Sequence, residues 1–97
     1  MSVLFNLEFP IQPDKVDSFL SFMTEALVAT RAYEGCISVK TYLHEETSTV
    51  LLVEEWAAAE NQAAYMQWRL ETGLVEALAE YLSGQLIVKQ YLPKEDV

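Results

Sequence analysis

The sequence has few basic residues, one cysteine and one histidine. Six lysines and arginines stand against 15 acidic residues, which gives a net charge of −9. Nucleic acids and anionic membranes are bound through clustered Lys and Arg, so neither is an expected partner. The lone cysteine excludes an intrachain disulfide. Because this composition suits a reducing compartment, we expect a cytoplasmic protein.

Several kinds of site also lack their sequence signatures. No group of His, Cys and acidic residues has metal-ligand spacing, and there is no glycine-rich phosphate loop. The first ten residues, MSVLFNLEFP, lack the features of a signal peptide, and no apolar run approaches the ~20 residues of a membrane helix. We therefore expect no metal and no membrane association. Cys36 is interpreted as a small core thiol, because a nucleophilic cysteine needs a basic partner.

Hydrophobic residues, in contrast, are abundant and make up 52% of the 97 residues. A chain of this length predicts one domain over residues 1–97. Such a small domain has little interior in which to bury so much apolar surface. We therefore expect a homodimer, in which a second copy covers the remaining apolar surface.

The first half of the chain predicts a strand, a helix and a hairpin. Residues 3–9, VLFNLEF, place apolar side chains at alternate positions, as a strand does. Asp14 is a candidate N-cap for a helix that ends before Gly35. Residues 36–44 and 50–56 then read as two strands joined by the polar turn EETST.

The second half predicts a broken helix and a last strand. Residues 58–82 have helical spacing, interrupted near Gly73, and residues 86–92 read as a strand. The element order predicts an α+β fold of the ferredoxin-like, split βαβ type, with a four-stranded antiparallel sheet and helices on one face. Both faces of the predicted sheet carry apolar side chains, so the second face is the expected dimer contact.

Two segments resemble a known family. They are ATRAYEGCISVKTYLHEE (residues 29–46) and VLLVEEWAAAENQAAYMQWRLETG (residues 50–73). The Arg before "GC", the "EEW" that ends a strand, and an aromatic residue nine positions after the Trp are similar to the antibiotic biosynthesis monooxygenase family. This resemblance implies the dimeric α+β barrel. It also implies oxygenation of a small quinol- or anthrone-like aromatic without flavin, metal or haem. Haem-degrading members carry a helical His, and the predicted helices contain none.

The resemblance and the residue types together select candidate site residues. The candidate catalytic residues are Asn6, Tyr65, Arg69 and His44, and the candidate substrate-binding residues are Trp56, Trp68 and Tyr42. A mid-strand amide needs partners, a helical Arg can hold an oxyanion, and an imidazole titrates near neutrality.

Each candidate also has a purely structural interpretation. Asn6 can be a solvated edge residue, Trp56 a core aromatic, and His44 an exposed hairpin residue. Tyr65 and Trp68 can pack one face of an amphipathic helix, with Arg69 in a salt bridge on its surface.

Adjacent Glu54 and Glu55 point to opposite faces of a strand, so they cannot act as a carboxylate pair. One of them is expected to be buried beside Lys40, Lys89 or an arginine, and the other exposed. The function hypothesis is therefore a cofactor-independent monooxygenase acting on a small aromatic molecule. The alternatives are a non-oxidative isomerase or lyase, and a non-enzymatic ligand-binding dimer.

Overall fold

The computed structural model describes residues 2–97 and contains one sheet and a layer of helices. In chain order the elements are β1 (Val3–Pro10), the 3-10 turn η1 (Pro13–Lys15), α1 (Val16–Ala32), β2 (Cys36–His44), β3 (Thr49–Trp56), α2 (Ala59–Glu71), α3 (Leu74–Ala79) and β4 (Ile87–Tyr91). The predicted order of strands and helices is confirmed, and so is the α+β, ferredoxin-like fold class.

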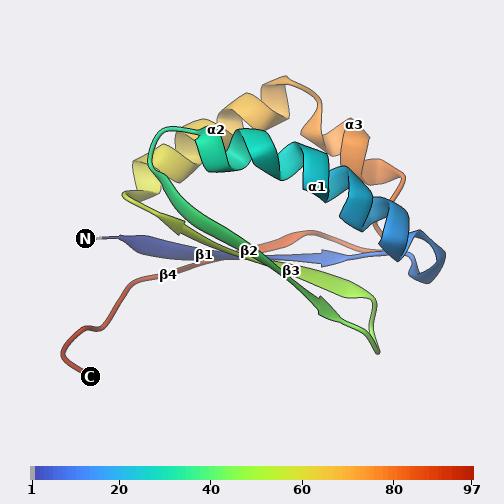
Figure 1. The fold of residues 1–97 in the computed structure, drawn as a ribbon, viewed down its shortest axis with the longest axis horizontal. Coiled ribbons are helices and arrows are strands. Elements are labelled where there is room, and N and C mark those ends of the chain that lie inside the picture. The colour runs from blue at the N-terminus through green and yellow to red at the C-terminus, as the bar shows by residue number, and fades with distance from the viewer. Residues whose placement is uncertain (1) are drawn as a thin grey trace.

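The sheet has the strand order β2-β3-β1-β4, and every neighbouring pair is antiparallel. All three helices lie over the same face (Figure 1). β1 and β3 therefore occupy the centre of the sheet, which places their alternate side chains directly beneath the helices.

The core forms because β1 and β3 alternate strictly. Phe5, Leu7 and Phe9 are buried on β1, and Leu52 is buried on β3. They pack against an apolar stripe on α1 that includes Phe19, which is fully buried. Burying one such side chain contributes about 1.5–3 kcal/mol, so this layer holds the helices on the sheet.

The prediction that Asp14 caps the first helix is wrong. Residues Pro13–Lys15 form a 3-10 turn, and α1 begins after it without a side-chain cap. Instead, Lys15 Nζ and Gln12 Nε2 donate hydrogen bonds to the Glu80 carbonyl, which ties the start of α1 to the end of α3. Proline at the first position of the turn fixes φ there, so the chain turns before the helix begins.

Gly35 allows a close approach between the start of β2 and α2. Its φ is +89°, and a Cβ at this position would lie 2.3 Å from Cγ of Asn61. Its carbonyl accepts a hydrogen bond from the Ala57 N–H at 2.7 Å. Only glycine suits both the left-handed backbone and the contact, so this residue fixes where α2 sits over the sheet.

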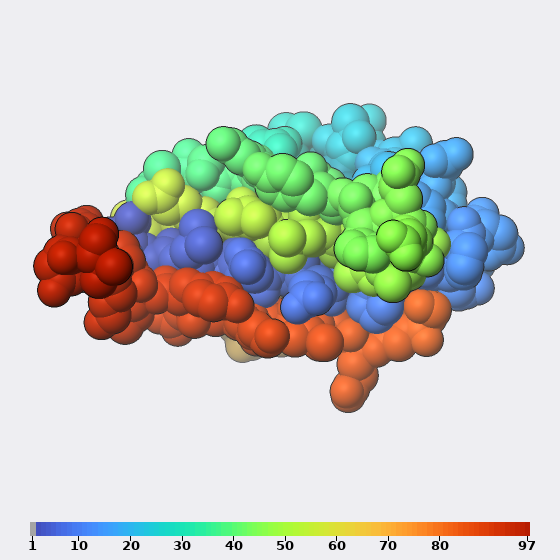
Figure 2. All heavy atoms as spheres, turned by 90° about the horizontal axis from the view of Figure 1, so that it is seen from below, coloured from blue at the N-terminus to red at the C-terminus, as the bar shows by residue number. Residues whose placement is uncertain are grey.

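The opposite face of the sheet is not covered by helices. Figure 2 views this face, on which the four strands lie side by side. Leu4, Leu51 and Val53 are half-buried there, while Tyr42 and Ile87 are exposed. This set of side chains is called the outer face below, and the helix-covered set is called the inner face. Within residues 2–97, no helix has the length and apolar character needed to cross a membrane.

Candidate functional site

A cavity of about 50 Å3 lies between the inner face and the helices. Its walls come from β1, β3 and all three α-helices, and most of them are apolar. The lining residues are Leu7, Phe9, Phe22, Met23, Ala26, Leu27, Thr30, Leu52, Glu54, Tyr65, Met66, Arg69, Leu74, Leu78 and Leu86. A few convergent polar groups in an apolar cavity are the usual composition of a small-molecule site.

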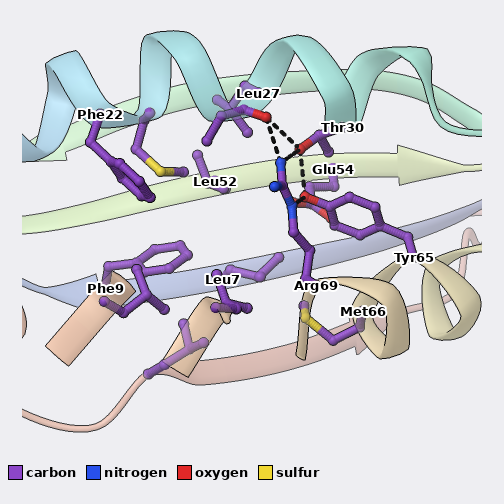
Figure 3. A pocket seen from close by; sticks show the side chains of 15 residues that line it. Leu7, Phe9, Phe22, Leu27, Thr30, Leu52, Glu54, Tyr65, Met66 and Arg69 are labelled. Atoms are coloured by element: carbon purple, nitrogen blue, oxygen red, sulfur yellow. Dashed lines mark hydrogen bonds between the residues drawn. The ribbon is translucent and has the colours of Figure 1, made fainter. Parts of the chain in front are cut away.

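Three polar side chains meet at one end of the cavity (Figure 3). Arg69 Nε donates a hydrogen bond to the Tyr65 hydroxyl at 2.7 Å, and Arg69 Nη2 donates to the Ala26 carbonyl and to Thr30 Oγ1. The Tyr65 and Thr30 hydroxyls also bond to each other. These three residues are called the polar cluster below. The guanidinium can only donate, so the Tyr65 and Thr30 oxygens accept from it through their lone pairs. The protons of these two hydroxyl groups stay free for other hydrogen bonds, including the one between them.

The contacts of Arg69 differ from the surface salt bridge of its structural interpretation. Its guanidinium carbon lies 5.3 Å from the Tyr65 ring centre and 4.9 Å from the Trp68 ring centre. Its hydrogen bonds run inward to α1 and to the cavity, not outward to a surface acid. A fixed positive charge therefore faces an apolar cavity, where it can stabilise an anion far more than it could in water.

Glu54 also lines this cavity, although it was not among the candidate residues. It is only 1% exposed and accepts a hydrogen bond from Trp56 Nε1 at 2.9 Å. Burial raises the pKa of its carboxyl group, and the Trp56 bond opposes that rise. No Lys or Arg partner is found for it in the described part of the chain, contrary to expectation. The sequence signal for its burial is that Glu54 lies on the same side of the strand as Val50 and Leu52, both of which are buried.

The two tryptophans support the site without lining the cavity. Trp56 is fully buried, and its ring centre lies 5.3 Å from that of Tyr65. Trp68 is 36% exposed and packs against Tyr33 at 5.7 Å. Trp56 thus holds Glu54 and Tyr65 in place from within the core, and Trp68 covers Arg69 from outside.

The other three candidates lie on the outer face. The register places Asn6 between Val53 and Lys89, Tyr42 opposite Leu51, and His44 opposite Thr49. Asn6 and His44 border a surface hollow of about 340 Å3 that is separate from the inner cavity. The structure therefore does not bring Asn6 and His44 together with Tyr65 and Arg69 within one protomer, and their catalytic roles stay predictions.

Two features of the outer candidates are chemically distinct. Asn6 Oδ1 is buried and has no hydrogen-bond partner among residues 2–97. His44 is exposed, and its Nδ1 lies 3.1 Å from Thr47 Oγ1. An amide oxygen that is shielded from water without a donor is unfavourable, so a partner from outside the protomer would stabilise it.

The cysteine and the acidic residues supply no further site within the described residues. Burial and the nearby Glu54 charge raise the pKa of the half-buried Cys36 thiol, while Arg31 opposes them. A thiol with a raised pKa is a weak nucleophile, which agrees with its interpretation as a core residue. Among residues 2–97, no three His, Cys, Asp or Glu side chains are grouped so that they could hold a metal ion.

A surface hollow of about 340 Å3 lies immediately outside the cavity. Phe22, Ala26, Arg69 and Leu74 line both spaces. The hollow lies at the junction of α2 and α3, and Gly73 and Thr72 are on its rim. The hollow and the cavity therefore share part of one wall, which includes Arg69.

The family model described as antibiotic biosynthesis monooxygenase matches residues 2–81. The chain belongs to this family. Among curated proteins, none matches the chain. This family membership confirms the resemblance seen in the sequence. The chain therefore has the fold of this monooxygenase family.

Solved structures with this family's fold cover nearly the whole chain. A conserved protein from Methanosarcina mazei Go1 has a TM-score of 0.85 at 20% identity, over 97% of this chain and 94% of that one. A monooxygenase from Streptomyces coelicolor, in complex with the ligand nanaomycin D, has a TM-score of 0.79 at 15% identity, over 99% and 90%. A protein of unknown function from Nitrosomonas europaea has a TM-score of 0.77 at 17% identity, over 96% and 95%. At these identities the likeness establishes the fold of the family.

Proposed function

We propose that this protein is a monooxygenase that oxidises a small quinol- or anthrone-like aromatic with O2 and without a cofactor. The observation that carries the proposal is the inward-facing Arg69, bonded to Tyr65 and Thr30 at the end of an apolar cavity. An aromatic ring suits the apolar walls, and the polar cluster suits an oxygen substituent that becomes negatively charged.

The chemistry follows from the charge of Arg69. Loss of a proton makes the substrate an electron-rich anion, which the guanidinium and the Tyr65 hydroxyl stabilise. The anion then reduces O2. For an anthrone-like methylene, one oxygen atom replaces two hydrogens on carbon and the other leaves as water, so the substrate supplies all four electrons. The apolar walls keep bulk water from the reacting carbon.

The cavity must widen to admit such a ring. Its volume of about 50 Å3 accommodates water-sized molecules rather than an aromatic system. Met23 and Met66 both line it, and unbranched methionine side chains change rotamer at little cost. We therefore expect ligand binding to move these two side chains first.

The test is oxygen consumption with a panel of hydroquinones and anthrones. The wild-type protein should consume O2 with at least one of them, and Arg69→Met should lower kcat/KM by about 10–100-fold through loss of anion stabilisation. Arg31→Met is the matched control, because Arg31 bonds to the Val39 carbonyl at 3.0 Å and does not line the cavity. No consumption across the panel would reject the proposal.

A non-oxidative isomerase or lyase is a second candidate. It is favoured by the Tyr65 hydroxyl, which lines the cavity within a chain of hydrogen bonds that can exchange its proton. Turnover under strict anaerobiosis would establish this activity and reject oxygenation. A ligand-binding protein without catalysis would bind the same aromatics but turn over none of them.

We also propose that the protein acts as a homodimer joined through the outer face. The support is the apolar set Leu4, Leu51, Val53, Ile87 and Tyr91, together with the unpartnered Asn6 Oδ1. Val53→Glu should give monomers, because it places a charge at the centre of this contact. Light scattering at micromolar concentration measures the outcome, and a monomeric wild-type protein would reject the dimer.

A further inference from the structure

Glu54 is a buried acid in the cavity, and the reaction proposed above assigns it no role. It lies on β3 between the inner-face residues Leu52 and Trp56, and only 1% of its surface is exposed. It lines the cavity together with the polar cluster. Its carboxyl group therefore faces the space that a ligand would fill, rather than bulk water.

Trp56 holds this carboxyl group without neutralising it. The indole N–H donates to one carboxylate oxygen, Oε1, at 2.9 Å, and the ring is fixed by burial and by its packing on Tyr65. A neutral donor orients the carboxyl group and lowers its basicity less than an arginine or lysine partner would. Burial also raises the pKa of Glu54, which makes it a stronger proton acceptor than an exposed glutamate.

The polar cluster and Glu54 approach the cavity from different elements. Arg69 and Tyr65 come from α2, Thr30 comes from α1, and Glu54 rises from the sheet (Figure 3). A hydroxyl group at this end of the cavity would thus meet a proton acceptor from the sheet and a positive charge from the helices. Acid–base catalysis combined with anion stabilisation needs these two groups.

We propose that Glu54 is the proton acceptor of this cavity and removes the phenolic proton of an aromatic substrate. The substrate O–H bond breaks, its electron pair stays on the substrate oxygen, and the proton bonds to a carboxylate oxygen of Glu54. Arg69 and Tyr65 hold the resulting phenolate. Trp56 is a positioning residue. The inference takes its substrate class from the proposed function, but the proton transfer itself needs no O2.

The experiment uses 4-nitrophenol as the probe under anaerobic conditions, since its phenolate is coloured. Wild-type protein should bind it as the phenolate below the solution pKa of the probe, and the proton should stay on the protein. Carbon-13 NMR of labelled glutamate carboxyl groups should show Glu54 becoming protonated on binding. Calorimetry in two buffers of different ionisation enthalpy should detect no proton release.

Glu54→Gln is the informative variant, because the amide keeps the side-chain volume and an oxygen that can accept the Trp56 bond. It should reduce the bound phenolate fraction at least tenfold. With any substrate that the oxygen panel identifies, it should lower kcat/KM by about 10²–10⁴-fold and remove the acidic limb of the pH profile. Glu55→Gln is the matched control, since Glu55 lies on the outer face and bonds to Ser2.

Several outcomes would overturn the inference. Equal phenolate formation in Glu54→Gln would do so, and so would an unchanged Glu54 signal in wild-type protein that holds the phenolate. The NMR result decides alone if the variant does not fold. No saturable binding of 4-nitrophenol or 1-naphthol at millimolar concentration would also reject it.

The two proposals can fail separately. Phenolate formation with a protonated Glu54, but without O2 consumption by any hydroquinone or anthrone, would leave Glu54 as the acceptor and reject oxygenation. Oxygen consumption at the same kcat/KM in Glu54→Gln would reject Glu54 and keep the monooxygenase.

Discussion

The inner and outer faces of the sheet are built from alternate residues of the same strands, yet they differ in how their polar side chains are hydrogen-bonded. On the inner face, the Glu54 carboxylate has a donor from Trp56 and opens onto a cavity. On the outer face, Asn6 Oδ1 is shielded but has no partner within residues 2–97. The buried carboxyl group of the inner face thus has a donor, whereas the shielded amide oxygen of the outer face has none among the described residues. In the helix layer, the buried Gln62 Nε2 is also without a partner among residues 2–97.

This difference indicates two separate roles for one sheet. The inner face is closed by helices and can isolate a small molecule from water. The outer face has both apolar and polar side chains, and no helix covers it (Figure 2). If both proposals hold, substitutions of neighbouring residues on one strand should change chemistry and association independently.

The largest effect on stability is expected from Leu52→Ala. Leu52 is 2% exposed and borders the cavity, so its truncation should lower the free energy of unfolding by about 2–5 kcal/mol. Leu51→Ala, one residue away on the outer face, should cost less in the protomer and should weaken the dimer. Urea unfolding at several protein concentrations measures both. Equal, concentration-independent losses would contradict the separation of the two faces.

The next effect is on ligand binding. Arg69→Met should weaken binding of 4-nitrophenol by about 10–100-fold, since a hydrogen bond to a charged group contributes about 1.5–3 kcal/mol. His44→Gln, which changes the outer-face candidate, tests whether binding also depends on that face. Calorimetric titration of both variants compares the faces directly. A larger loss in His44→Gln than in Arg69→Met would place the ligand on the outer face.

A pH dependence of stability should come from Glu54. Burial raises its pKa in the folded protein, so the folded state holds its proton more tightly than the unfolded state does. The free energy of unfolding should therefore fall as pH rises from the ordinary glutamate range through the raised pKa, and then level off. The total is about 1.4 kcal/mol for each unit of pKa difference.

Urea unfolding between about pH 4 and pH 8 measures whether the free energy of unfolding falls or rises with pH. These limits roughly span the ordinary titration ranges of glutamate and histidine. Glu54→Gln should remove this pH dependence. The free energy of unfolding of the variant should therefore rise relative to that of the wild-type protein as pH increases. A wild-type curve that rises with pH relative to Glu54→Gln would show that Glu54 has a lowered pKa instead.

The smallest effect is expected from Asn6→Val. In an isolated protomer it removes an unpartnered buried oxygen and adds a residue that favours strands, so stability should rise by about 1 kcal/mol. If a second subunit supplies a donor to Asn6, the variant should instead lose stability and favour monomers. Thermal unfolding combined with light scattering distinguishes the two results.

The fold could be predicted because its signals are local and mutually consistent. Alternation in residues 3–9 and the glycines at 35 and 73 place most elements close to the observed bounds, although the predicted helix end at residue 82 lies beyond the observed end at Ala79. The helix start was less predictable. Pro13 and Asp14 suit a helix N-terminus, but they were used in a 3-10 turn that precedes it.

The site could be predicted only in part, because parity does not say which face meets the helices when both faces are apolar. The spacing of Tyr65 and Arg69 predicts that they share one helix face, and in the structure both line the cavity, while their catalytic roles stay predictions. Asn6 has the parity opposite to Phe5, yet nothing local shows that the Phe5 side is the covered one. Glu54 was missed because its partner is an indole N–H rather than a cation.

Arg69 is part of the wall shared by the buried cavity and the surface hollow outside it. If a molecule passes through this wall beside Arg69, the guanidinium has to leave the Ala26 carbonyl and Thr30. Breaking charge-assisted hydrogen bonds of about 1.5–3 kcal/mol each adds an activation barrier in both directions. If the proposed ligand enters here, the side chain that would hold its charge would also limit its residence time.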